Sequence, residues 1–136
     1  MDSSNNVVRK FKLLEELEKS EKEIADPLLS YGLENSEDIS MSNWKGIIIG
    51  PSNTNYDGRI YSLKIEVGEN YPLQPPIVKF ISRVNLPFVD QKNGLVDLKK
   101  IIQWEKNSTI ESILVTIKKN MSKNKKLVQP SEGTFF

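Results

Sequence analysis

Three stretches in the middle of the chain decide the fold. Residues 44–50 read Trp-Lys-Gly-Ile-Ile-Ile-Gly, residues 59–67 read Arg-Ile-Tyr-Ser-Leu-Lys-Ile-Glu-Val, and residues 71–81 read Tyr-Pro-Leu-Gln-Pro-Pro-Ile-Val-Lys-Phe-Ile. The connection between the first two is rich in Gly, Pro and Asn, which is typical of a turn. The prolines of residues 71–76 fix φ and remove hydrogen-bond donors, so this segment is expected to be an extended crossing between strands. Together the three stretches predict an antiparallel meander.

The strand predicted at residues 59–67 alternates cleanly, with one exception. Ser62, Lys64 and Glu66 point to one side, and the opposite side is apolar: Tyr61, Leu63, Ile65 and Val67. This is the pattern of a strand with one buried face. Ile60 is the exception, because it falls on the polar side. Consecutive residues alternate sides, so either Ile47 or Ile48 of the neighbouring strand must also point outward. An apolar spot on the outer face of the sheet is therefore predicted.

A first helix is predicted from Val7 to about Ser20, with Asn6 as its N-cap. At about 100° per residue, the side expected to face the core holds three leucines: Leu13, Leu14 and Leu17. Phe11 lies well outside this stripe and shares its sector with Val7 and Val8. The second patch is either a frayed end that folds back on the body or a docking site for another protein.

The remaining segments are predicted to be a linker, a long loop, a second helix and a tail. Residues 25–39 are read as an acidic linker, and residues 82–99 as a long surface loop without periodicity. Ser108 and Glu111 form a predicted capping box, and a covering helix follows with an apolar face: Ile110, Ile113, Leu114, Ile117 and Met121. The tail from residue 124 is expected to be extended or to form a short helix. The isomer of the Tyr71–Pro72 bond stays open.

Composition excludes several classes of function. The 136 residues predict one domain, residues 1–136, and include neither Cys nor His. Thiol nucleophiles, Ser-His-Asp triads and zinc-thiolate sites are therefore excluded, and no metal or cofactor is expected. The net charge of +1 gives no general attraction to nucleic acid or membrane. The apolar runs are too short to span a bilayer, so we expect a soluble intracellular protein.

The order of these elements resembles the ubiquitin-conjugating fold, an α+β fold with an N-terminal helix, an antiparallel meander of about four strands and a covering helix. Catalytic members carry His-Pro-Asn and then Gly-x-Ile-Cys in the loop after the third stretch. This chain has Arg83-Val84-Asn85 and Gly94-Leu95-Val96-Asp97 at these positions. Asn85 matches the residue associated with stabilising the oxyanion, whereas Asp97 replaces the nucleophile. The family's later C-terminal helices are expected to be truncated.

These departures resemble the ubiquitin-conjugating enzyme variants. The phrases that carry the resemblance are Phe-Lys-Leu-Leu-Glu-Glu-Leu-Glu at 11–18, Ser-Tyr-Gly-Leu at 30–33, Ile-Gly-Pro at 49–51, Thr-Asn-Tyr at 54–56, Arg-Ile-Tyr-Ser-Leu at 59–63 and Gln-Pro-Ser-Glu-Gly at 129–133. The resemblance implies a non-catalytic subunit that pairs with an active conjugating enzyme and directs ubiquitin chains through lysine sixty-three of ubiquitin. Roles in DNA-damage tolerance, postreplication repair and signalling are implied, in the cytoplasm and nucleus.

The resemblance also assigns site residues. Phe11, with Val7 and Val8 beside it, matches the position that docks on the partner enzyme. Ser30, Ile47 and Ile60 match positions that hold the acceptor ubiquitin noncovalently, and Ile60 is also the exception in its strand. Asn85 and Asp97 are left as vestigial active-site positions. The alternative is a stand-alone module that binds ubiquitin and short peptides, as in the variants of sorting machinery.

Overall fold

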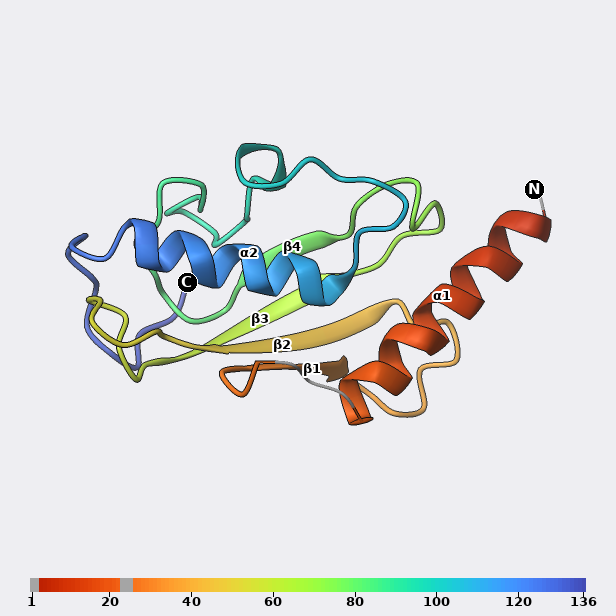
Figure 1. Ribbon diagram of the computed structural model, residues 1–136, viewed down its shortest axis with the longest axis horizontal. Helices are drawn as coiled ribbons and strands as arrows, with labels where there is room; N and C mark the ends of the chain where they lie inside the picture. The colour runs from red at the N-terminus through yellow and green to blue at the C-terminus, as the bar shows by residue number, and fades with distance from the viewer. Residues whose placement is uncertain (1–2, 23–25) are drawn as a thin grey trace.

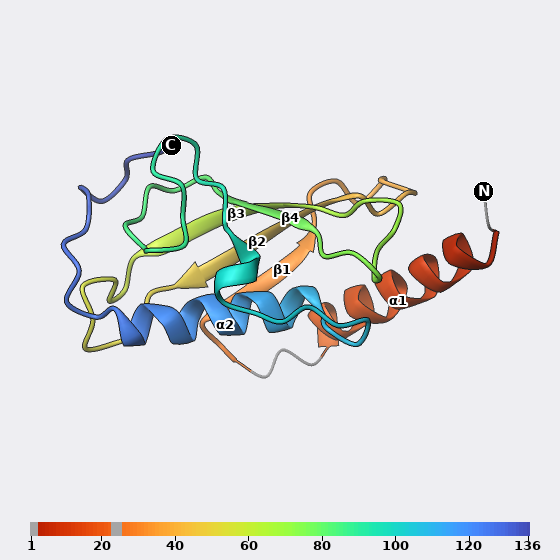
Figure 2. The ribbon, with the colours of Figure 1, turned by 90° about the horizontal axis from the view of Figure 1, so that it is seen from above.

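The computed structural model describes residues 3–22 and 26–136 and has an α+β architecture (Figure 1). A four-stranded antiparallel sheet in the order β1-β2-β3-β4 is covered on one face by the long helix α2 (Figure 2). The predicted helix, meander and covering helix are thus confirmed. The elements in chain order are α1 (Ser3–Lys22), β1 (Leu29–Leu33), β2 (Asn43–Ile49), β3 (Ile60–Glu66), β4 (Ile77–Phe80), the 3-10 helix η1 (Leu98–Lys100) and α2 (Ile110–Lys123).

The core lies between the sheet and α2. The apolar face predicted for the covering helix is completely buried: Ile110, Ile113, Leu114, Ile117 and Met121. A Cβ on Gly46 of β2 would lie 3.2 Å from a Leu114 methyl group, so the helix passes very close to the sheet there. The capping box lies one residue later than predicted, because Thr109 caps the Ser112 N–H and the Ser112 hydroxyl accepts from the Thr109 N–H.

Helix α1 differs from the prediction at its start and on its buried side. It begins at Ser3, so Asn6 lies within the helix and is not its N-cap. Neither Gly nor Pro precedes Asn6 to stop the helix from extending toward the N-terminus. Leu13 is buried as predicted, but Leu14 is 44% exposed, and Glu16 is buried in place of Leu14.

Two predicted irregular segments contribute to the folded body. The linker prediction was wrong at Leu29–Leu33, which forms β1 and pairs with β2; Ala25, at the start of that linker, lies outside the described residues. The loop of residues 82–99 is irregular as predicted, but it is not only a surface loop. Val84, Leu86 and Phe88 are buried, and they alternate with less buried residues as a strand would. The loop therefore supplies part of the core.

The crossing segment leads from β3 into β4, and the C-terminal tail packs beside the end of β4. The Tyr71–Pro72 peptide bond is cis. The tail beyond α2 is extended and runs past the loop of residues 51–58 toward the end of β4, where Ser82 and Phe135 form an isolated bridge (Figure 1). Among the described residues, neither helix is long and apolar enough to cross a membrane.

Candidate interaction surfaces and the loop of Asp97

Helix α1 presents an exposed apolar stripe, which we call the α1 patch: Val7, Val8, Phe11 and Leu14. Phe11 is 66% exposed and lies at the centre of the stripe, so the off-core placement predicted for it is confirmed. Val7, Phe11 and Leu14 follow the i, i+4, i+7 spacing of one helix face. Leu14 was predicted to face the core, but it is exposed, and its i, i+3 spacing from Phe11 is consistent with a place in the patch. The helix does not fold back to cover the patch.

A groove of about 620 Å³ runs beside the α1 patch. Its walls come from α1, from Pro72 of the crossing segment, and from three residues before α2: Lys106, Asn107 and Thr109. Arg9 fixes the N-terminal half of α1 at this site, because its guanidinium donates to the carbonyl oxygens of Gly68, Ser40 and Val67 at 2.7–3.2 Å. The patch is therefore held in a defined position relative to the body.

The outer face of the sheet carries the predicted apolar spot. Ile47 pairs with Ser30 on one side and Ser62 on the other, so these three residues form one row across β1, β2 and β3. Ile60 is 64% exposed and pairs with Ile49 in the next row. Ile48 is fully buried, which decides the open question in favour of Ile47 as the outward residue.

A row of lysines borders this spot. Lys45, Lys64 and Lys79 pair with one another across β2, β3 and β4. Beyond them, Ile77 on β4 is a separate exposed apolar residue. The register thus brings together Ser30, Ile47 and Ile60, which are distant in sequence, and separates them from Ile77.

Asn85 is held by the C-terminal tail through contacts that we call the tail clamp. The Asn85 N–H donates to Oε1 of Gln129 at 2.9 Å, and Nε2 of Gln129 donates to the Asn85 carbonyl at 3.0 Å. The side-chain amide of Asn85 donates to the Val128 carbonyl at 2.9 Å. The amide matched to oxyanion stabilisation is therefore engaged by the fold. No sequence pattern indicated Val128 or Gln129 as its partners.

Tyr56 completes the tail clamp from the loop before β3. Its hydroxyl donates to the Asn85 carbonyl at 2.9 Å. Burial raises the pKa of Tyr56 to about 12, since a phenolate would be poorly solvated there. At neutral pH the hydroxyl is thus a stable hydrogen-bond donor and is unsuited to act as a base.

Asp97 lies at the N-terminus of η1 and lines a groove of about 940 Å³. Its side chain is exposed and makes no capping hydrogen bond, whereas its N–H donates to the Phe88 carbonyl at 2.8 Å. Gly94, three residues earlier, has φ of 82°, and a Cβ there would lie 2.3 Å from the Phe80 carbonyl oxygen. The chain is thus tightly packed at Gly94, whereas position 97 carries an exposed carboxylate and no thiol.

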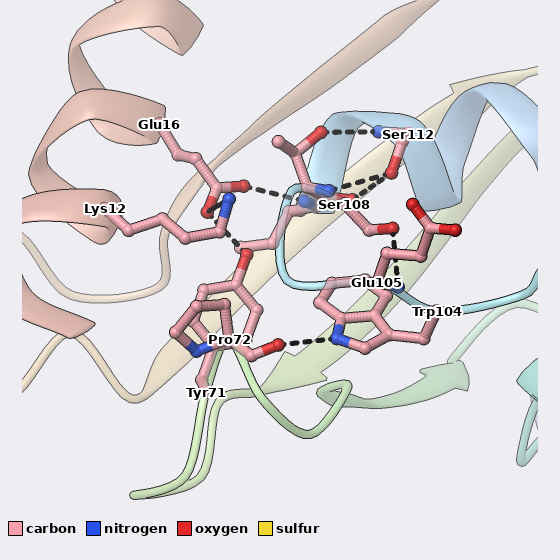
Figure 3. A network of polar contacts seen from close by, with 10 residues as sticks. Lys12, Glu16, Tyr71, Pro72, Trp104, Glu105, Ser108 and Ser112 are labelled. Atoms are coloured by element: carbon pink, nitrogen blue, oxygen red, sulfur yellow. Dashed lines mark hydrogen bonds and ion pairs between the residues drawn. The ribbon is translucent and has the colours of Figure 1, made fainter. Parts of the chain in front are cut away.

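Within residues 3–22 and 26–136, no three Asp or Glu side chains gather closely enough to hold a metal ion. The one buried carboxylate among these residues is Glu16. Burial raises its pKa, against the hydrogen bonds from Tyr71 and Ile110, which lower it. Glu16 lies in a joint between α1 and α2 and not in the loop of Asp97 (Figure 3).

Comparison with known proteins places these features in a family. The family model described as ubiquitin-conjugating enzyme matches residues 12–133. The ubiquitin-conjugating enzyme E2 variant 1C of Arabidopsis thaliana is 50% identical over 98% of this chain and 96% of its own length. The ubiquitin-conjugating enzyme variant MMS2 of Saccharomyces cerevisiae is 47% identical over 97% of this chain and 99% of its own length.

A solved structure agrees with these sequence matches. Human ubiquitin-conjugating enzyme E2 G1 superposes with a TM-score of 0.70 at 28% identity, over 90% of this chain and 98% of that chain. Thioester formation by this fold requires a cysteine thiolate, and this chain has no cysteine. The chain therefore belongs to the ubiquitin-conjugating enzyme family and is a non-catalytic variant within it.

Proposed function

We propose that this chain pairs with an active ubiquitin-conjugating enzyme and positions an acceptor ubiquitin for synthesis of chains linked through lysine sixty-three of ubiquitin. The α1 patch, centred on Phe11 with Val7 and Val8 beside it, docks on the partner enzyme. The outer sheet face of Ser30, Ile47 and Ile60 holds the acceptor ubiquitin noncovalently. The relatives that share nearly the full length of this chain support this assignment.

The observation that carries the proposal is the separation of two exposed apolar surfaces. Phe11 lies on α1, which extends past the sheet, whereas Ile47 and Ile60 lie on the sheet face turned away from α2 (Figure 2). Because the surfaces belong to different elements, one can bind the partner while the other binds ubiquitin. A chain that lacks the thioester-forming cysteine but carries two such surfaces is suited to bring two proteins together.

The mechanism is positional. The partner's cysteine holds the donor ubiquitin as a thioester, and this chain holds the second ubiquitin so that one lysine reaches the thioester carbonyl. Such proximity and orientation lower the barrier by several kcal/mol in favourable cases, without a catalytic side chain on the positioning subunit. Linkage specificity then follows from which lysine the geometry presents. Asn85 and Asp97 take no part in the reaction.

The proposed setting follows from the same function. Chains of this linkage serve DNA-damage tolerance and signalling in the family that the sequence resembles. We therefore propose that the complex acts in the cytoplasm and nucleus.

The test is a reconstituted chain-building assay with activating enzyme, a conjugating enzyme specific for lysine sixty-three, and ubiquitin. Free chains are expected only when this chain is added. Phe11→Ala is expected to abolish co-elution with the partner and to reduce chain formation. The matched control is Val128→Ala, because Val128 is 80% exposed and apolar but lies on the tail.

Two other results would change the assignment. If the chain has no effect on chain formation while NMR titration still detects ubiquitin on the sheet face, the stand-alone binding module replaces the proposal. If Phe11→Ala and Val128→Ala elute with the partner equally well, the docking role of the α1 patch is wrong.

A further inference from the structure

Helix α1 contacts the body of the protein through a buried carboxylate, that of Glu16. Glu16 is 5% exposed and lies on the same side of the helix as the buried Leu13. Burying a carboxylate is costly unless hydrogen bonds replace its lost water. A leucine at this position would cover the neighbouring core without that cost. Covering the core therefore does not explain why a carboxylate occupies this position.

Glu16 links three segments that are far apart in sequence (Figure 3). Its Oε1 accepts from the Ile110 N–H, at the first residue of α2, at 2.7 Å. Its Oε2 accepts from the Tyr71 hydroxyl at 2.5 Å, and Nζ of Lys12 lies 3.9 Å from the same oxygen. The N-terminal N–H groups of a helix lack partners within the helix, and the Glu16 carboxylate accepts from one of them. Its negative charge also interacts favourably with the positive end of the α2 dipole.

The joint borders the proposed docking surface. Phe11 precedes Glu16 by five residues, which is about 7.5 Å along a helix. Phe11, Glu16 and Pro72 all line the 620 Å³ groove beside the α1 patch. Pro72 is held in turn by Trp104, whose indole N–H donates to its carbonyl at 2.7 Å. The orientation of α1 relative to the sheet and α2 therefore sets the position of the Phe11 side chain in the groove.

We infer that Glu16 is a positioning residue for partner docking, whose bonds to Ile110 and Tyr71 hold α1 so that Phe11 and the groove form one preassembled surface. The inference rests on the proposed docking role of Phe11. Apolar packing allows a helix to slide or rotate by small amounts. The Arg9 contacts hold the N-terminal half of α1 against residues 40–42 and 67–68, and the two directed hydrogen bonds to Glu16 fix the helix against α2 and the crossing segment. Preassembly lowers the entropic cost of binding, because α1 is already ordered before the partner docks.

The inference predicts a specific pattern of affinities for the conjugating partner, measured by calorimetry on the full chain. Glu16→Ala is expected to weaken binding about tenfold. Glu16→Gln is expected to restore most of it, because the amide oxygen still accepts from the Ile110 N–H and its NH₂ group can donate to the Tyr71 oxygen. The matched control is Glu18→Ala, which removes only a surface ion pair with Lys22 on the same helix.

A double-mutant cycle with Phe11→Ala separates positioning from general destabilisation. If Glu16 acts through Phe11, then Glu16→Ala is expected to have little further effect in the Phe11→Ala background. Ubiquitin binding to the sheet face is expected to stay unchanged in both variants. Should Glu16→Ala fail to fold, Tyr71→Phe removes one bond of the joint and takes its place in the cycle.

Three results would overturn the inference while leaving the proposed docking function standing. The first is an equal effect of Glu16→Ala with and without Phe11, and the second is a parallel loss of ubiquitin binding, which would indicate damage to the fold. The third is an unchanged partner affinity in Glu16→Ala while Phe11→Ala weakens it, which refutes the inference alone. If Phe11→Ala itself has no effect, the proposed docking function fails and the inference fails with it.

Discussion

Replacing Ile60 by alanine tests whether the outer sheet face binds ubiquitin. Ile60 is 64% exposed in the free chain. If ubiquitin covers it, on the order of 100 Å² of apolar surface leaves water, which is worth about 2.5 kcal/mol. Alanine keeps part of that contact, so the variant is expected to lose about 1.5 kcal/mol of binding free energy. This corresponds to an affinity about tenfold weaker.

The chain provides a matched control for Ile60. Ile77 is 53% exposed and lies on β4, on the other side of the row formed by Lys45, Lys64 and Lys79. Ile77→Ala removes a comparable apolar side chain from the same face of the same sheet. Its affinity for ubiquitin is expected to equal that of the unmodified chain. Both affinities are measured by NMR titration of isotope-labelled ubiquitin with each variant.

Two outcomes would refute the reasoning behind Ile60. Equal weakening by Ile60→Ala and Ile77→Ala would mean that ubiquitin adheres to apolar surface in general. An unchanged affinity in Ile60→Ala would mean that ubiquitin binds elsewhere. Because Ile60 is exposed, its replacement is expected to change the free energy of unfolding by no more than about 0.5 kcal/mol, which denaturation in urea checks.

Three further outcomes are expected from other parts of the structure. Burial raises the pKa of Glu16 above its ordinary value of 4.5, so the folded state binds this proton more tightly than the unfolded state. The contribution of Glu16 to the free energy of unfolding therefore falls as pH rises from 4.5 through the raised pKa. Glu16→Gln is expected to remove this pH dependence, which urea denaturation at a series of pH values measures. An identical pH dependence in the variant would contradict the raised pKa of Glu16. Gln129→Ala removes both of its hydrogen bonds to the Asn85 backbone and is expected to lower the free energy of unfolding by about 1–2 kcal/mol in the same assay; an unchanged midpoint would show that the tail clamp adds no stability. Asp97→Cys is expected to build no ubiquitin chains without the partner enzyme, because the Asn85 amide is bound to the Val128 carbonyl; chains on a gel of the partner-free reaction would contradict this.

The sequence predicted best where the spacing of apolar residues was regular. The alternation in β3 gave the correct side for every residue from Ile60 to Glu66, and the five apolar residues of α2 are all buried. The run Ile47, Ile48, Ile49 carries no alternation of its own. Only its pairing with Ser30 and Tyr61 on the neighbouring strands decides which isoleucine faces outward.

The sequence failed where a residue's environment depends on distant partners. Glu16 is a typical surface residue of a helix, and its burial depends on Tyr71 and on the N–H of Ile110, 94 residues away. For the same reason Leu14 was placed in the core. The β1 strand is only five residues long and carries Gly32, so it has little strand signal without its partner β2.

The tail clamp has a consequence for how this chain can change over evolutionary time. Asn85 is anchored by Gln129 and Val128, so its amide now contributes to holding the tail in place. Freeing that amide for chemistry would break its hydrogen bond to the Val128 carbonyl and lower the stability of the tail before any activity was regained. A cysteine at position 97 would thus confer no immediate benefit. The side chain that an oxyanion role would need is thus used by the fold to anchor the tail, which works against gaining catalysis by a single substitution.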